Sequence, residues 1–325
     1  IYTKIIFIHH DNLFSAFNDL GYIAAKLSAY INISDRSNHF CLESSNVDLL
    51  KSSGINRSSK INHATEFSIS CINSETKWGV TFVGHLMANL TQYPAESIPG
   101  GNHLQVMAWN RFSNSSIPLQ PYIKRMVLDT YISNSLGSGA KHNLVATEQF
   151  LIAGLNKFSS PMRGQLISSV KKNRIDIFGG DLSYGKMNDP LLKIQKNNIY
   201  YQPATQNYQD ASSIYQSSRI NLNISSLQFD SAVNNRVFDI IQSGGFLLTD
   251  KRSDLNDIFS FSSEISFDSP EELNEKIKYW SDSSTNNKYD EIKREMQAIC
   301  SYKFTYPSIV QTIIELTNSQ KELND

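Results

Sequence analysis

Arg236 and Asp239 are the two residues of this sequence whose types and spacing most clearly indicate chemistry. They lie three positions apart in NNRVFDIIQSGG (234–245), where the spacing of apolar residues predicts a short helix with one buried face. Arg236 would stand in the first turn, where the helix dipole disfavours a cation unless an anion accompanies it. One interpretation is an ion pair with a neighbouring carboxylate, such as that of Asp239. The other is a bound phosphate.

Under the second interpretation, this helix is suited to a nucleotide. A guanidinium group binds a diphosphate through paired N–H groups, and a carboxylate accepts hydrogen bonds from ribose hydroxyls. Asn234 and Asn235 come directly before Arg236 and can cap the helix. A buried strand at 220–224 precedes the helix and an apolar strand at 246–248 follows it, which predicts a βαβ unit. Open α/β sheets bind ligands at such strand-to-helix junctions.

Glycines mark further turns of interest. Gly244 and Gly245 follow the predicted helix, and the first is a C-cap signal while the second indicates a close approach of the backbone. Gly84 ends the β-branched run at 79–84, and Gly180 lies in GGD (179–181), directly after a predicted strand at 174–178. Each glycine is either part of a turn or a place where a ligand approaches the backbone.

A third candidate group follows the first predicted strand, at 4–8. His9, His10 and Asp11 can be a base that handles an acceptor, the ligands of a metal, or solvated loop residues. No third ligand stands at a spacing typical of a metal site, so we expect no bound metal. The sequence has no G-x-S-x-G, Walker, HExxH, GxGxxG or D-x-D motif, which removes the main support for several classes of enzyme.

Composition excludes other classes. The 325 residues carry 30 Lys and Arg against 31 Asp and Glu, so no basic surface for nucleic acid is expected. Three cysteines stand far apart, which favours a reducing, cytoplasmic location without a structural metal or cofactor. No apolar run approaches a membrane span and no signal peptide is visible. Since the chain opens on Ile1, we expect it to be part of a longer protein.

The order of predicted elements gives an α/β fold with a Rossmann-type parallel sheet. We expect a partial amino-terminal α/β domain at 1–75, with a strand at 4–8 and a helix at 47–53. A nucleotide-binding Rossmann-like domain would follow at 76–310, and a helix or tail at 311–325. The domain at 76–310 would contain a helical insertion at about 88–160, which opens with a loop and continues with helical patterns at 123–132 and 144–155. Further strands are predicted at 198–201 and 264–267, and a helix starts at Pro270.

The motifs together resemble a known family. RINLNI (219–224), NNRVFDIIQSGGFLLTDKRSDLNDIF (234–259) and SFDSPEELNEKIKYW (266–280) are similar to the carboxyl-terminal domain of the CgeB-like (spore-maturation-protein-B-like) glycosyltransferases, a group-1 branch of the GT-B superfamily. VTFVGHL (80–86) resembles that domain's first strand, and RIDIFGGD (174–181) the strand and glycine turn that follow. The resemblance covers about 78–87 and 163–310.

This resemblance implies a donor site. Arg236 would contact the donor diphosphate, Asp239 would hold the ribose, and neighbouring positions would shape the pocket, namely Gly84, Gly180, Asn223, Asn235, Gly244, Gly245 and Phe246. His10 and Asp11 would act on the acceptor side. Two positions depart from the pattern: the helix acid is Asp239 where the family usually has Glu, and the superfamily's E-x7-E pattern would have an acid at Ser231.

We therefore expect transfer of a sugar from a nucleotide-diphosphate-sugar to a glycan, protein or small-molecule acceptor, with no metal or other cofactor and, by resemblance, with retention of configuration. The insertion at 88–160 would be a surface for an assembly partner. The alternative, favoured by Ser231, is a non-catalytic GT-B-like module that binds a nucleotide or serves a structural role.

Overall fold

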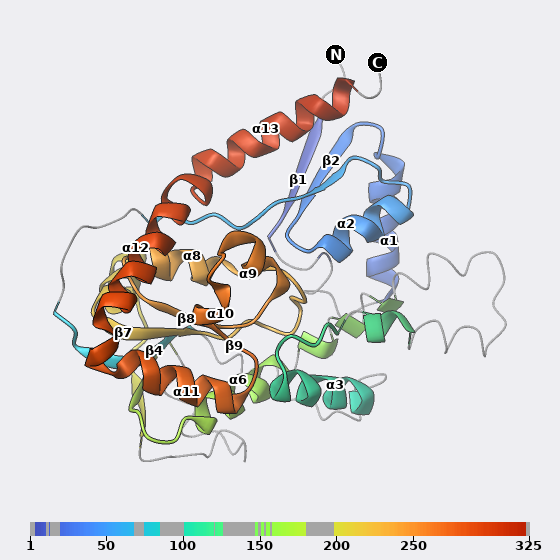
Figure 1. Ribbon diagram of the computed structural model, residues 1–325. Coiled ribbons are helices and arrows are strands. Elements are labelled where there is room, and N and C mark those ends of the chain that lie inside the picture. Colours follow the sequence, from blue (N-terminus) through green and yellow to red (C-terminus); the bar gives the residue numbers. More distant parts are fainter. Residues whose placement is uncertain are drawn as a thin grey trace.

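The computed structural model describes residues 4–10, 13, 20–67, 75–84, 101–119, 121–125, 147–148, 151–152, 154–156, 158–179 and 198–322 (Figure 1). Within these residues the chain forms two parallel sheets with helices packed against them, which confirms the predicted α/β class. Asp11 and Gly180 lie outside the described residues. So does most of the predicted insertion, including parts of both helical patterns.

The smaller sheet has the order β1-β2-β3, built from β1 (Ile5–His9), β2 (Ser37–Cys41) and β3 (Ser58–Lys60). The helices α1 (Leu20–Asn32) and α2 (Ser44–Ser52) connect the strands and bury a small apolar core that includes Ile23, Leu27 and Leu50. We call residues 4–60 the three-stranded unit. The strand predicted at 4–8 and the helix predicted at 47–53 are present within one to three residues at each end, whereas the sequence did not predict β2 or β3.

The larger sheet has the order β6-β5-β4-β7-β8-β9, all parallel. Its strands are β4 (Trp78–Val83), β5 (Ile175–Phe178), β6 (Ile199–Gln202), β7 (Ser218–Asn223), β8 (Leu247–Asp250) and β9 (Ser266–Phe267). The chain starts in the middle with β4, runs outward to β6, and returns to place β7 on the other side of β4. This reversal is a topological switch point, where open parallel sheets leave a crevice beyond the ends of the strands. We call residues 75–303 the six-stranded unit.

Helices cover both faces of this sheet. On one face α8 (Asn235–Gln242) packs between α7 (Tyr208–Gln216) and α12 (Asn286–Lys303), and on the other α11 (Pro270–Ser281) packs against α6 (Ser159–Ser169) (Figure 1). The start of α11 follows the predicted signal, since the Ser269 hydroxyl accepts a hydrogen bond from the Glu272 N–H and the Glu272 carboxylate accepts one from the Asp268 N–H. The large apolar core lies between these layers.

Shorter elements complete the six-stranded unit. The helix α9 (Ser253–Ile258) follows β8, and η4 (Ser283–Thr285) joins α11 to α12. The predicted strand at 264–267 is wrong in its first half, because α10 (Ser262–Ile265) occupies it and only Ser266–Phe267 pair with β8. The helix α3 (Gly101–Ser113) lies in the predicted insertion, but the sequence did not predict it, because the first helical pattern in that region was placed at 123–132.

The last helix, α13 (Tyr306–Glu322), leaves the six-stranded unit and runs alongside the three-stranded one (Figure 1). Its Ile313 joins an apolar cluster with residues from both units, namely Phe40, Leu42, Ile61, Phe229 and Ala232. Residues 311–322 of the predicted segment are thus the continuation of a helix that starts at Tyr306. None of the described helices is both long enough and apolar enough to cross a bilayer.

Candidate functional site

A cavity of about 370 Å³ opens at the switch point of the larger sheet, beyond the end of β4. Residues of α7 and the amino-terminal part of α8 line it, and Phe67, from the segment that follows β3, borders it as well. Its lining residues are Phe67, Val83, Gly84, Thr205, Gln206, Asn207, Tyr208, Ala211, Tyr215, Asn235, Arg236 and Asp239. Four of the residues singled out by sequence therefore meet at one cavity: Gly84, Asn235, Arg236 and Asp239. We call it the switch-point cavity.

Arg236 lies at the back of this cavity and is held by neutral groups. Its Nη1 donates a hydrogen bond to Asn223 Oδ1 at 3.2 Å, and its guanidinium carbon lies 5.3 Å from the centroid of the Phe82 ring. Asn223 is fully buried and also accepts from Asn234 Nδ2 and donates to Thr249 Oγ1, which fixes its amide toward the arginine. In the described part of the chain no carboxylate forms an ion pair with Arg236. The predicted alternative of an Arg236–Asp239 ion pair is therefore not observed.

Gly84 makes room for the guanidinium. A Cβ at this position would clash with Nη2 of Arg236 and lie 2.9 Å from its Cζ. The backbone of Gly84 also has φ of +143°, a conformation that side chains rarely adopt. Two independent reasons thus require glycine at the end of β4, and one of them is the position of the Arg236 side chain.

Asp239 lies one helical turn after Arg236 and is held from another part of the chain. Its Oδ1 accepts a hydrogen bond from Thr65 Oγ1 at 2.6 Å, and its Oδ2 accepts a longer one from Asn235 Nδ2 at 3.4 Å. Burial raises the pKa of Asp239 to about 6, although the Thr65 hydroxyl and the Arg236 charge act in the opposite direction. Near neutral pH the carboxylate is therefore ionised and able to accept further hydrogen bonds at the cavity.

Aromatic side chains border the same cavity. The rings of Phe67 and Tyr208 meet at right angles with centroids 5.4 Å apart, and Tyr208 is largely exposed. Tyr215 lies deeper, and burial raises its pKa to about 12, partly offset by its hydrogen bond to Arg236. Sequence reasoning did not find Thr65, Phe67, Tyr208 or Tyr215. They come from the linker that follows β3 (residues 61–67) and from α7, a helix that the sequence predicts at 209–217 without indicating that it faces a ligand.

The glycines after α8 have a different placement from the one that the resemblance implies. Gly244, with φ of +86°, ends the helix, and Gly245 packs so tightly that a Cβ would lie 2.9 Å from the Tyr215 carbonyl oxygen. Phe246 is fully buried, stacked on Tyr289 with ring centroids 4.3 Å apart. None of the three lines the switch-point cavity. Their contacts are those of helix termination and core packing.

The histidines lie on the three-stranded unit. His9 points back into that unit, where its Nε2 lies 3.2 Å from His39 Nδ1. His10, at the end of β1, stacks on His63 with centroids 6.5 Å apart, and His63 in turn meets Phe229 of the β7–α8 loop. Burial and the nearby His10 lower the pKa of His63 to about 4, so this imidazole is neutral. His10 thus faces the larger sheet but does not line the switch-point cavity.

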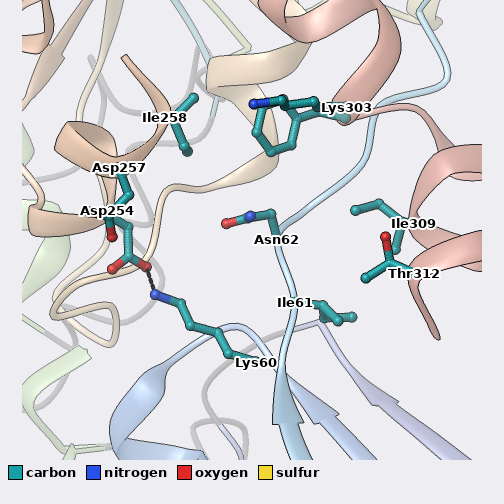
Figure 2. Close-up of a pocket in the computed structure, with 10 residues that line it drawn as sticks. Lys60, Ile61, Asn62, Asp254, Asp257, Ile258, Lys303, Ile309 and Thr312 are labelled. Carbon is teal, nitrogen blue, oxygen red and sulfur yellow. Dashed lines mark ion pairs between the residues drawn. The ribbon is translucent and has the colours of Figure 1, made fainter. Parts of the chain in front are cut away.

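A second cavity, of about 400 Å³, lies where the linker, α9 and α13 converge (Figure 2). Lys60 reaches across it to Asp254, with Nζ and Oδ2 2.6 Å apart, while Asn62 and Ile309 line other parts of the wall. The segment 61–67 runs from this cavity to the switch-point cavity, since Asn62 lines the first and Phe67 the second. We call this second space the hinge cavity. Among the described residues no cluster of three or more His, Cys, Asp or Glu is arranged to hold a metal ion.

Known proteins resemble this chain in both sequence and fold. Residues 163–315 match the model of a family described as glycosyl transferase-like, and this stretch contains Arg236 and Asp239. A comparison with curated protein sequences gave no match.

The crystal structure of Alr3699/HepE from Anabaena in complex with UDP superposes with a TM-score of 0.56 at 10% identity, over 97% of this chain and 72% of that one. The same Anabaena protein in complex with UDP-glucose gives a TM-score of 0.53, again at 10% identity and with 97% and 72% coverage. Likeness at this identity establishes the arrangement of the chain and no more. With two parallel α/β units and a helix that runs from one to the other, the chain shares the fold of the Anabaena protein, a GT-B fold.

Proposed function

We propose that this protein is a glycosyltransferase that takes its sugar from a nucleotide-diphosphate-sugar. The observation that carries the proposal is Arg236, a cation in the first turn of α8 that borders a cavity and has no carboxylate partner in the described part of the chain. The matching family is glycosyl transferase-like, and the similar Anabaena structures hold UDP and UDP-glucose, which makes uridine the base of first choice.

In this proposal the residues of the switch-point cavity divide the donor between them. Arg236 and the first N–H groups of α8 bind the diphosphate. Asp239, ionised above a pH of about 6, accepts hydrogen bonds from the ribose hydroxyls. The ring pair of Phe67 and Tyr208 offers a surface on which the base packs.

The reaction exchanges one bond at the anomeric carbon for another. The bond from that carbon to the diphosphate oxygen breaks with its electron pair on the diphosphate, a bond to an acceptor hydroxyl oxygen forms, and the hydroxyl proton passes to a base, for which His10 is our candidate. Arg236 stabilises the negative charge that develops on the leaving diphosphate, so we propose that no metal is needed. His10 and the adjoining Asp11 remain our candidates for handling the acceptor. Retention of configuration, a CgeB-like specificity and a cytoplasmic location are further parts of this proposal, and the proton NMR spectrum of the product reads the configuration directly.

Calorimetry with UDP tests the donor site. Arg236→Ala removes charge-assisted hydrogen bonds to phosphate, each of which contributes about 1.5–3 kcal/mol, so UDP affinity should fall at least a hundredfold. Arg174→Ala is the matched control, because Arg174 pairs with Asp176 on the outer part of the sheet. Unchanged UDP affinity in Arg236→Ala would exclude Arg236 from the donor site.

The second candidate is a module that binds the nucleotide without turnover. Ser231 favours it, because the superfamily pattern would have an acid there. A panel of nucleotide sugars in a thermal-shift assay, followed by a donor-hydrolysis assay, separates the two candidates. Stabilisation by a nucleotide sugar with neither hydrolysis nor transfer would favour the module.

A further inference from the structure

Glu43 places a buried carboxylate from the three-stranded unit on a loop of the six-stranded unit. The residue follows β2, is only 1% exposed, and its side chain reaches the loop between β7 and α8. Its Oε1 accepts from the backbone N–H groups of Asp230 at 2.8 Å and Ala232 at 3.0 Å. The Ser231 N–H lies 3.2 Å from both oxygens, and the Ser231 hydroxyl donates to Oε2 at 3.1 Å.

Three successive backbone N–H groups that converge on one carboxylate form an anion-binding nest. No lysine or arginine of the described chain forms an ion pair with Glu43, so these N–H groups and one hydroxyl are its compensation. Burial raises the pKa of Glu43 and the three backbone bonds lower it. In an amide of the same shape one of the two oxygens becomes an NH₂ group, which cannot accept from the Ser231 N–H, so the nest keeps a single neutral acceptor oxygen in place of two that share a charge.

The six-stranded unit holds the nest in shape without Glu43. Arg111 of α3 is buried and forms an ion pair with Asp230 at 2.7 Å, while its Nη2 donates to the Asp230 carbonyl oxygen at 3.0 Å. The Leu119 N–H donates to the same Asp230 carboxylate, and the Asp254 N–H donates to the Ser231 carbonyl oxygen at 3.2 Å. The loop is therefore a preformed socket on one unit, and Glu43 is the group that the other unit inserts into it.

The socket adjoins the proposed donor site. Ala232 is four residues before Arg236, and the intervening residues lead straight into the first turn of α8. Around the socket, the apolar cluster of Phe40, Leu42, Ile61, Phe229, Ala232 and Ile313 attracts the two units without directional preference. The hydrogen bonds of Glu43 supply the direction that such a contact lacks.

We propose that Glu43 is a positioning residue for sugar transfer, which rests on the function proposed above. Its carboxylate docks in the Asp230–Ala232 nest when the two units close, and this fixes the acceptor-side residues of the three-stranded unit, His10 among them, over the donor bound at Arg236. The nest thereby makes closure dependent on the carboxyl group of one residue. Donor binding to the six-stranded unit does not require it.

The test compares Glu43→Gln with the wild-type chain in three measurements. Hydrogen exchange of peptides covering 230–232 should accelerate at least tenfold, because the three amides then share one neutral acceptor oxygen in place of a charged carboxylate. The Kd for UDP should stay within about threefold, whereas kcat for transfer should fall at least tenfold with little change in the donor KM. Glu43→Asp, which keeps the charge on a shorter side chain, should restore part of kcat. Glu264→Gln is the control, since Glu264 pairs with Lys288 on the surface and should change none of these.

Two results would overturn the proposal. Unchanged protection at 230–232 would mean that the nest does not depend on Glu43, and tighter UDP binding in Glu43→Gln would mean that Glu43 competes with the donor. If the wild-type chain turns over no nucleotide sugar, the proposed function fails, yet hydrogen exchange still decides whether Glu43 closes the units. If Glu43→Gln does not fold, Ser231→Ala removes a single donor to Oε2 and should accelerate the same exchange about threefold.

Discussion

Glycines lie at both ends of α8, but the two ends differ in their surroundings. At its amino-terminal end, Gly84 and Arg236 leave a cationic group at a cavity, with only neutral partners. At its carboxyl-terminal end, Gly244, Gly245 and Phe246 stop the helix and bury an aromatic ring. The family resemblance groups these residues into one donor site. In the structure, the residues that line the cavity and the residues that pack in the core lie at opposite ends of a helix about 12 Å long. Substitutions at one end should therefore change binding, and those at the other should change stability.

Phe246→Ala should show the largest effect, at the packing end. The ring is fully buried between Tyr289 and Trp280, so its removal should lower the free energy of unfolding by about 3–5 kcal/mol. Chemical denaturation measures this loss. UDP affinity, measured at a temperature where the variant is folded, should stay within twofold, and a large loss of affinity would break the distinction between the two ends.

Gly84→Ala should have the largest effect on binding. The added Cβ forces the Arg236 guanidinium out of its place and strains a backbone at φ of +143°, so UDP affinity should fall about a hundredfold by calorimetry. The melting temperature should drop by only a few degrees. Gly79→Ala is the matched control in the same strand, because a Cβ there meets nothing closer than 3.9 Å.

Asp239 gives the binding end a pH dependence. Because burial raises the pKa of Asp239 to about 6, the carboxylate that we propose for the ribose hydroxyls becomes protonated as pH falls through 6. Affinity for uridine, which carries no ionisable phosphate, should therefore fall up to about fivefold between pH 6 and pH 5. Asp239→Asn should bind uridine weakly and equally at both values. A wild-type affinity that is flat over this range would contradict the role of Asp239.

Thr65→Val should have the smallest effect. The change removes the hydroxyl that donates to Asp239 at 2.6 Å and leaves the shape nearly unchanged. Losing this bond raises the pKa of Asp239 further, so the midpoint of the uridine pH profile should move upward by a few tenths of a unit, while affinity at pH 7 should fall less than about twofold. An unshifted midpoint would show that Thr65 does not act on Asp239.

The sequence predicts the amino-terminal end of α8 and two of its cavity-lining residues because the signals for them are local. Apolar spacing defines the helix, and the cost of a cation in the first turn marks Arg236. The partners that complete the cavity are not local: Thr65 is 174 residues from Asp239, and no pattern in its neighbourhood points to α8. The same is true of Glu43, which meets the Asp230–Ala232 loop across 187 to 189 residues.

Two differences between the predicted and the observed strands have local physical origins. The strand β2 reads SNHFC, with no alternation of polar and apolar residues, because its serine, asparagine and histidine are all buried in the sheet. The segment 262–267 is apolar at spacings that suit either a strand or a helix, and packing against β8 divides it into α10 and the short β9. Gly245 and Phe246 lie in a βαβ unit whose sequence does not reveal which end of the helix faces the ligand.

Thr65 makes the linker part of the proposed nucleotide site. Its backbone N–H donates to the Phe304 carbonyl oxygen, at the junction of α12 and α13, while its hydroxyl holds the carboxylate assigned to the ribose. Any rotation of one unit against the other that moves this segment alters the affinity for a nucleoside. Linkage is reciprocal in free energy, so a nucleoside bound at Asp239 favours, to the same extent, the relative orientation of the units in which the Thr65 bond is intact. In such an arrangement the donor itself sets the balance between the open and closed protein.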